Sequence, residues 1–91
     1  MLKINNLINY AMENEILASI KEILNKDGQV NADSITMETK FEELDIDSLG
    51  SLLLINDLED KYGIIIENDE VFKISTIGEA IVKVRKLIEN K

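Results

Sequence analysis

Apolar residues recur along this 91-residue chain at the spacing expected of three amphipathic helices. In residues 12–24, 48–61 and 77–88 they fall three or four positions apart, which places them on one face of a helix. Only four glycines and no proline interrupt the chain, so its composition offers little opposition to helix formation. The pattern therefore predicts an all-α fold built around three main helices.

Residues that typically begin or end helices stand at the borders of these segments. Asp47 can accept hydrogen bonds from the free amides in the first turn of the second helix, and Gly63 ends that helix. Thr76 and Glu79 have the spacing of a capping box at the start of the last helix. Gly28 is placed to end the first helix. These signals support the three segments independently of the apolar pattern.

The segments between the helices carry apolar residues of their own. Residues 28–47 form a long first loop, which we expect to be held down by five apolar anchors: Val30, Ile35, Met37, Phe41 and Leu44. The isoleucine run in residues 63–72 favours a strand, but a lone strand would have no pairing partner. We interpret this run as a packed connection that leads into a short helical turn at 69–72. The expected fold is a small antiparallel helical bundle of three main helices plus one short helix.

Residues 1–11 have two interpretations. Their apolar members at helical spacing are Ile4, Leu7, Ile8 and Ala11. The segment is therefore either the start of the first helix or a frayed N-terminal extension before a domain of residues 12–91. Asparagines interrupt its apolar stretch and no small-residue cleavage site follows, so it does not have the pattern of a signal peptide.

The net charge of −8 is concentrated in one third of the chain. Residues 41–70 contain ten acids and one base. Nucleic acid is excluded as a partner because phosphate binding needs clustered lysine or arginine. No run of 18 apolar residues is present to span a membrane, and we expect a cytoplasmic monomer. The acidic region is either a solvated face that aids solubility or a docking surface for basic partners.

The second predicted helix has apolar residues on two sides. Its core-facing residues are Ser51, Leu54, Ile55, Leu58 and Tyr62. Leu49, Leu52 and Leu53 lie off this face. Either the helix is covered on both sides at the centre of the bundle, or the extra leucines form an exposed patch bordered by acids, as in a protein interface.

Ser48 lies at the start of this helix, between acids and leucines. A nucleophilic serine needs a base, and the chain has no histidine, while Lys40 and Lys61 are distant along the chain. The absence of histidine and cysteine also argues against a zinc site. We therefore expect no catalytic residue. Ser48 is either a residue tolerated in the first helical turn or the attachment point of a phosphoester, which a helix N-terminus would stabilise.

The sequence DIDSLG partly imitates a calcium-binding loop. Asp45, Asp47 and Gly50 match the first, third and sixth positions of such a loop. Leu49 and Asn56, however, occupy two ligand positions, one of which requires a bidentate glutamate. We therefore expect no metal site, leaving open only a weakly bound divalent ion beside Asp45 and Asp47.

Two stretches of the chain, LDIDSLGSLLLINDLEDKYG and DEVFKISTIGEAIVKV, resemble the acyl carrier proteins. The mark of that family is an Asp-Ser-Leu tripeptide at the start of the second helix, here Asp47-Ser48-Leu49. Phe41 and Leu44 upstream also match. The resemblance covers residues 12–89, which is nearly the whole chain.

The resemblance implies that Ser48 carries a 4′-phosphopantetheine arm, transferred from coenzyme A by a separate Mg²⁺-dependent phosphopantetheinyl transferase. The thiol of the arm would hold acyl intermediates as thioesters and shuttle them between enzymes of fatty-acid synthesis. Acyl-transferring and chain-elongating enzymes would dock their basic patches on the second helix. The matching docking positions are Asp47, Leu49, Leu52, Leu53, Asp57, Glu59 and Asp60. The chain would then be a carrier that other enzymes modify and load, and not an enzyme itself.

Two positions depart from the pattern of fatty-acid carriers. These carriers usually have an acid directly after the tripeptide and a glutamate one turn into the helix, where this chain has Gly50 and Leu53. Leucine in place of charge should weaken electrostatic steering and strengthen apolar contact. The alternatives are therefore a dedicated carrier of a polyketide or nonribosomal peptide pathway and, from another class, an unmodified acidic helical interaction module.

Overall fold

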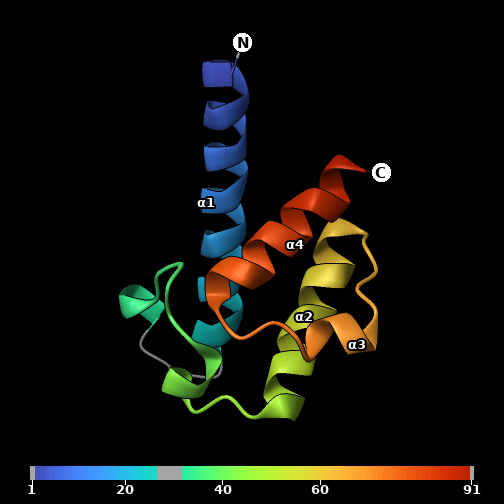
Figure 1. The fold of residues 1–91 in the computed structure, drawn as a ribbon. Helices are drawn as coiled ribbons and strands as arrows, with labels where there is room; N and C mark the ends of the chain where they lie inside the picture. The colour runs from blue at the N-terminus through green and yellow to red at the C-terminus, as the bar shows by residue number, and fades with distance from the viewer. Residues whose placement is uncertain (1, 27–31, 91) are drawn as a thin grey trace.

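The computed structural model describes residues 2–26 and 32–90 and confirms the all-α prediction. Its elements are α1 (Leu2–Lys26), the 3₁₀ helices η1 (Ala32–Ser34) and η2 (Phe41–Leu44), α2 (Ser48–Tyr62), α3 (Asn68–Val71) and α4 (Ile77–Glu89). Figure 1 shows α1 and α2 running in opposite directions, with α4 crossing between them and α3 beside α2. The three main helices and the short fourth helix are thus present as expected.

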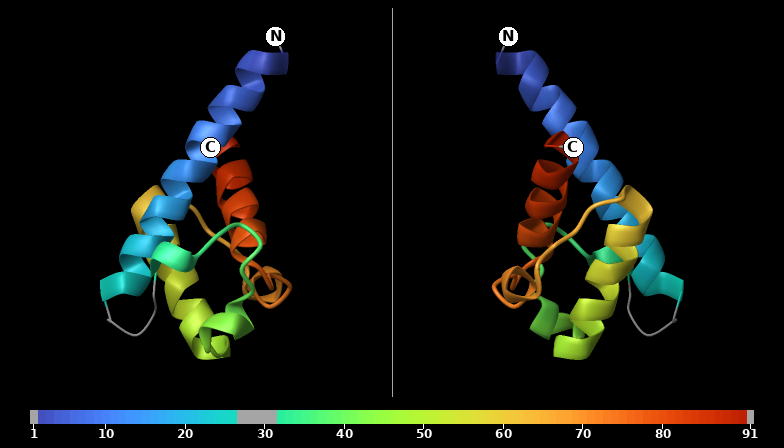
Figure 2. Two further views of the ribbon diagram at one scale, coloured as in Figure 1. Left: turned by 90° about the vertical axis from the view of Figure 1, so that its left-hand side faces the viewer. Right: turned by 90° about the vertical axis from the view of Figure 1, so that its right-hand side faces the viewer.

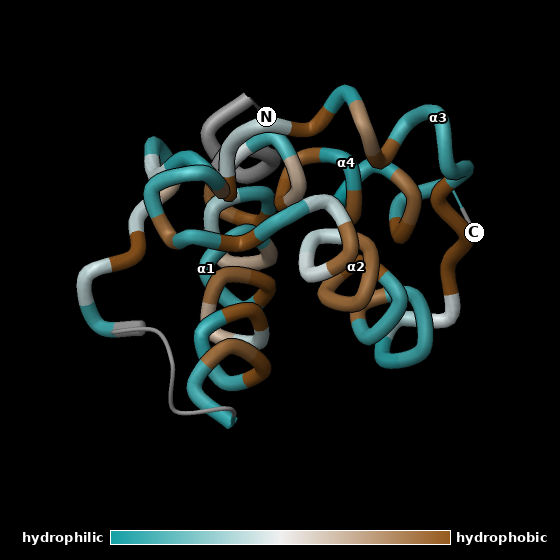
Figure 3. The backbone as a smooth tube through the Cα atoms, turned by 90° about the horizontal axis from the view of Figure 1, so that it is seen from below, coloured by the Kyte–Doolittle hydropathy of each residue, from teal (hydrophilic) through white to brown (hydrophobic). Residues whose placement is uncertain are grey.

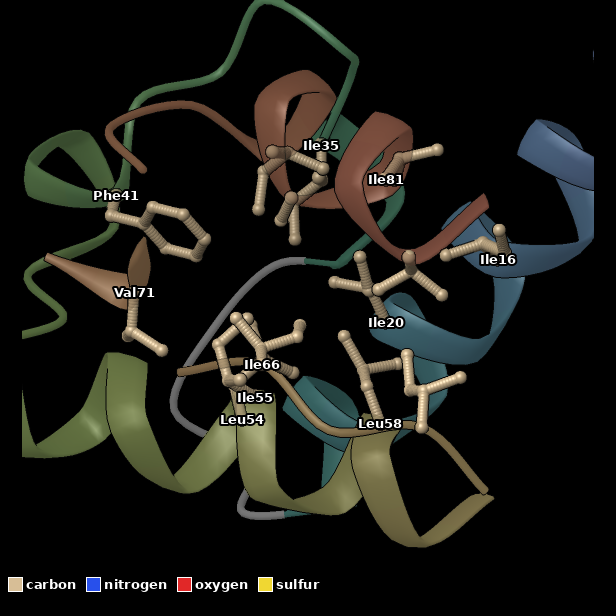
Figure 4. Packing of buried hydrophobic residues seen from close by; sticks show 14 residues of the cluster. Ile16, Ile20, Ile35, Phe41, Leu54, Ile55, Leu58, Ile66, Val71 and Ile81 are labelled. Carbon is tan, nitrogen blue, oxygen red and sulfur yellow. The ribbon is translucent and has the colours of Figure 1, made fainter. Parts of the chain in front are cut away.

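The apolar faces predicted from the sequence meet in one core. Its most deeply buried side chains come from α1, the first loop, α2 and α4: Ile16, Ile20, Ile35, Ile55, Leu58, Ile77, Ile81 and Val84. Figure 4 shows the labelled side chains of this core pointing toward one another from the surrounding elements. Burial of this apolar surface is the main source of stability for a domain of this size. Ile64 and Ile66 are also buried, which confirms that the isoleucine run is a packed connection and not a strand.

The first helix is longer than the predicted segment of residues 12–24. It continues without a break through the segment for which two interpretations were open, so 2–11 are the start of α1. Figures 1 and 2 show this part of α1 projecting beyond the rest of the bundle. The predicted helix end at Gly28 and the anchor Val30 lie outside the described residues.

Backbone hydrogen bonds tie the first loop to the start of α4. The amide of Ile77 donates to the Thr39 carbonyl at 2.8 Å, and that of Gly78 donates to the Met37 carbonyl at the same distance. A β-carbon added at Gly78 would lie 2.7 Å from the Met37 oxygen, so the close approach depends on glycine. Ile35 and Phe41 are buried beneath this loop, as predicted, and they hold it against the core.

The predicted capping box at the start of α4 is confirmed. The amide of Glu79 donates to the Thr76 hydroxyl at 3.1 Å, and the Thr76 amide donates to Glu79 Oε1 at 3.0 Å. The Ser75 amide also donates to Glu79 Oε1, at 2.9 Å. This bond is the main reason that the pKa of Glu79 lies below its ordinary value, with the Ser75 hydroxyl and the Thr76 amide adding to it.

The Glu79 carboxylate should make the stability of the fold pH-dependent. Because its folded pKa is below the ordinary value of 4.5, its contribution is present above that value and is lost as the pH falls through the folded pKa. We expect Glu79→Gln to lower the urea midpoint near neutral pH, and the difference from wild type to shrink in acid. Glu43→Gln, which removes an exposed charge, is the control. An equal Glu79→Gln effect in acid and at neutral pH would contradict this assignment.

Candidate functional site at the start of α2

Ser48 is the first residue of α2, and Asp47 is its N-cap as predicted. The Asp47 backbone is extended, and its Oδ1 accepts a hydrogen bond from the Gly50 amide at 2.8 Å. The Ser51 amide donates to the Asp47 carbonyl at 2.9 Å, which closes the first helical turn. These bonds set the direction of α2 and leave the Ser48 side chain exposed to solvent.

A tight turn before α2 aims the chain into this position. Asp45 ends η2 with φ 56° and ψ 30°, in the left-handed region that aspartate adopts more readily than most residues. The Ile46 amide donates to the carbonyl of buried Phe41 at 3.3 Å, and the Phe41 amide donates to the Ser75 carbonyl at 3.0 Å. The start of α2 is therefore held by the core through η2 and by the segment that precedes α4.

The surroundings of Ser48 do not activate its hydroxyl. Within residues 2–26 and 32–90, no group forms a hydrogen bond with this hydroxyl, and no cluster of three metal-ligating side chains is present. The first-turn amides and the dipole of α2 are oriented to favour a negative group on the residue at this end. The site fits a phosphodiester formed at Ser48 by another catalyst better than it fits a nucleophile.

A cavity of about 360 Å³ opens directly beside Ser48. It lies between α2, η2 and α3, and its lining includes Phe41, Ser48, Ser51, Val71, Phe72 and Ile74. The sequence did not identify Phe72 as a site residue, although this phenylalanine is largely exposed next to Ser48. The only available signal was an aromatic residue among the charged neighbours of a short helix. The exposed Ser48 side chain therefore lies beside a cavity lined in part by apolar residues.

The leucines of α2 differ in their exposure. Leu49 is 64% exposed and Leu53 is 56% exposed, whereas Leu52 is half-buried and packs against the core. The second apolar side of this helix is therefore partly covered by the bundle, at Leu52, and partly an exposed patch, at Leu49 and Leu53. Figure 3 shows the apolar first turns of α2 giving way to polar residues toward its end.

The predicted acidic docking residues also differ in their surroundings. Asp57 and Asp60 are exposed on α2. Glu59 is half-buried, and its Oε2 accepts a hydrogen bond of 2.7 Å from the Ile66 amide. The carboxylate of Glu59 thus holds the connection between α2 and α3 in place.

Together, the fold and this site define a small helical protein with an exposed serine at the start of α2. The family described as "Phosphopantetheine attachment site" matches residues 14–81. The acyl carrier protein of Beutenbergia cavernae is 39% identical over 70 residues, covering 76% of this chain and 85% of that protein. The acyl carrier protein of Lactobacillus acidophilus is 41% identical over 70 residues, covering 76% and 88%.

The crystal structure of an acyl carrier protein from Thermotoga maritima superposes with a TM-score of 0.81. It is 26% identical and covers 87% of this chain and 93% of its own. The chain therefore belongs to the acyl carrier protein family, as the resemblance implied.

Membership in this family defines the chain as a carrier and not an enzyme. Its prosthetic group is covalently attached phosphopantetheine, whose thiol supplies the thioester chemistry that a chain without cysteine lacks. Proteins of the family interact with a phosphopantetheinyl transferase and with acyl-handling enzymes. These findings replace the alternative of an unmodified interaction module. None of the described helices is long and apolar enough to cross a membrane.

Proposed function

We propose that Ser48 is the residue that carries the phosphopantetheine arm. The single observation that supports this most strongly is the position of Ser48, exposed at the N-terminus of α2 and beside a cavity. The transferase must reach the hydroxyl, and the first-turn amides then stabilise the phosphodiester that forms. Asp47 and Leu49 flank the attachment point: Asp47 holds the helix end through Gly50, and Leu49 offers an apolar surface to the transferase.

The test is to incubate the chain with coenzyme A, Mg²⁺ and a phosphopantetheinyl transferase and to measure its intact mass. We expect the mass to increase by one arm. A chain that gains no mass with several different transferases would contradict the proposal.

We further propose that partner enzymes dock on the exposed side of α2. Asp47, Leu49, Leu53, Asp57 and Asp60 form this docking surface, and their exposure supports its accessibility. Carboxylates around apolar side chains suit partners that present basic residues around an apolar centre. Leu52 and Glu59 contribute from beneath the surface, because one packs against the core and the other binds Ile66.

Fatty-acid synthesis is the pathway that we propose for this carrier, in the cytoplasm. Most of the named relatives are called acyl carrier proteins without a dedicated pathway. One relative, from Mycolicibacterium aurum, is a meromycolate extension acyl carrier protein, 32% identical over 80 residues. Its name refers to the extension of an acyl chain, which agrees with this proposal.

One observation supports a second candidate, a dedicated carrier of a polyketide or nonribosomal peptide pathway. Leu53 and Phe72 are exposed near the site, where charge would serve general basic partners better. A dedicated partner with an apolar docking surface would make use of both side chains. The two pathways predict different outcomes when enzymes of fatty-acid synthesis are given the holo protein to load.

Leu53→Glu is expected to increase acyl loading by fatty-acid enzymes, because an added carboxylate strengthens steering toward basic patches. The initial rate of malonyl transfer from malonyl-CoA to the holo protein should rise roughly two- to tenfold, mainly through faster association. Since Leu53 is more than half exposed, the fold should tolerate the change. Ile65→Glu is the matched control, as it adds the same charge at an exposed isoleucine in the α2–α3 connection.

Transfer to the wild-type protein would support the fatty-acid pathway, and a faster Leu53→Glu variant would show that position 53 tunes partner choice. No transfer to either protein by enzymes that load a known carrier would favour the dedicated pathway. Equal acceleration by Ile65→Glu would contradict a specific docking role for position 53.

A further inference from the structure

The N-terminal part of α1 extends beyond the contacts that hold the bundle together. Glu13 forms an ion pair of 2.9 Å with Arg85 of α4. Toward the N-terminus from this pair, Leu7 is 68% exposed, Tyr10 is 67% exposed, and Ile8 is more than half exposed. Figures 1 and 2 show this part of the helix projecting on its own from three directions. The family match begins at residue 14, so the projection lies outside it.

The exposed residues of α1 form a second stripe along the helix. Ile16 and Ile20 face the core and are almost fully buried. The exposed residues Leu7, Tyr10, Ala11, Asn14 and Ala18 are spaced by three or four positions and lie on the opposite side. This is the spacing of helices that pair along a seam. The large side chains stand in the N-terminal half of the stripe, and the alanines stand farther along.

The chemistry of this stripe argues for a second helix as its occupant and against a membrane surface. Helices that lie on membranes carry several lysine and arginine residues on their polar face, whereas residues 2–12 contain a single charged residue, Lys3. An enzyme that serves every member of the family would recognise the region that all members share. The projection lies outside the region matched by the family, so it is not where such an enzyme is expected to bind. Large side chains occupy one half of the stripe and alanines the other half, and this order favours a second copy of the chain as the partner.

Two copies of α1 related by a two-fold axis would fit one another in the antiparallel direction. The large side chains of Leu7 and Tyr10 in each copy would then face the other copy's half of the stripe that contains the small residues Ala11 and Ala18. Residues 2–26 contain three acids and three bases, so α1 itself carries no net charge. The acidic segments α2 and α3 lie away from the projection, which limits repulsion between the copies (Figure 1).

We propose that two copies of this carrier pair antiparallel through the outward stripe of α1 and leave Ser48 of each copy accessible. A seam over residues 7–18 is about three helical turns long and buries on the order of 1,000 Å², which is at the low end for a specific interface. The dimer is therefore weak and depends on concentration, in place of the simple monomer expected from the sequence. This pairing does not depend on which serine carries the arm.

Sedimentation equilibrium of the apo protein tests the pairing at concentrations from about 5 to 500 µM, the range in which a dimer with a small interface is expected to dissociate. The average mass should rise from that of one chain toward that of two as the concentration increases. Leu7→Glu should keep the mass of one chain throughout, while Ile65→Glu, with the same charge at another exposed site, should behave like wild type. A wild-type protein that stays monomeric, or equal effects of the two variants, would overturn the proposal.

Cross-linking determines the direction of the pairing, because the chain has no cysteine of its own. In an antiparallel pair Ala11 lies near the two-fold axis, so apo Ala11→Cys should form a disulfide-linked dimer under mild oxidation. The two copies of Ala18→Cys would be about 16 Å apart along the seam and should not link. Linking of Ala18→Cys at a rate equal to Ala11→Cys would show a parallel or non-specific contact. Unchanged loading of Leu7→Glu by the transferase would show that this variant is folded.

Discussion

Ser48→Ala is expected to abolish attachment of the phosphopantetheine arm completely, because it removes the only oxygen through which Ser48 can form the phosphodiester. The variant should show the mass of the unmodified chain after incubation with coenzyme A, Mg²⁺ and the transferase. The exposed position of Ser48 makes little contribution to packing, so the helix content should match that of wild type.

Ser51→Ala is the matched control for this experiment. Ser51 lies one turn further along α2 and is half-buried beside the same cavity. We expect Ser51→Ala to gain the arm as wild type does. If Ser48→Ala were still modified and Ser51→Ala were not, the attachment point would be Ser51 and the site described above would be wrong by one helical turn.

Leu58→Ala is expected to cause the largest loss of stability among simple truncations on α2. Leu58 is fully buried between α2 and the rest of the core, so removal of its side chain leaves a cavity. The free energy of unfolding should fall by about 3 kcal/mol, measured by urea denaturation of the apo protein. For a domain of this size such a loss is a large part of the total stability.

Leu49→Ala makes the same chemical change on the exposed side of the same helix. Its effect on the free energy of unfolding should be within about 0.5 kcal/mol, while the rate of loading by the transferase should decrease. Similar destabilisation by the two substitutions would show that Leu49 is part of the core and not of the docking surface.

The sequence predicted the fold well wherever local chemistry was sufficient. Asp47 accepts the Gly50 amide as a helix cap should, and Thr76 and Glu79 form the expected capping box. Both signals depend on residues three positions apart, so they can be recognised without knowledge of the tertiary structure. The core faces of α2 and α4 were predictable because a helix places every third or fourth residue on one side.

Features that depend on contacts between distant segments were not predictable in this way. Glu59 has the sequence context of a docking acid, yet its carboxylate binds the Ile66 amide, seven residues away across a turn. The two 3₁₀ helices in the first loop have no periodic pattern long enough to detect. The continuation of α1 through 2–11 also stayed open, because an amphipathic pattern does not show whether the helix projects or frays.

The location of the candidate site followed from the start of α2, but its shape did not. The left-handed turn at Asp45 and the buried ring of Phe41 place η2 opposite α3, and this placement creates the cavity beside Ser48. Phe72 joins that cavity from a segment more than twenty residues away in the chain. Only the packing of α3 against α2 brings this aromatic ring to the site.

Fragmentation of the tryptic peptide 41–61 from the loaded wild-type protein tests the central proposal most directly. Trypsin cleaves after Lys40 and after Lys61 to release this peptide, and Ser48 and Ser51 are its only hydroxyl-bearing residues. We predict that the fragment ions place the mass of the phosphopantetheine arm on Ser48. An arm on Ser51, or an unmodified 41–61 peptide from protein whose intact mass shows the arm, would contradict Ser48 as the attachment site.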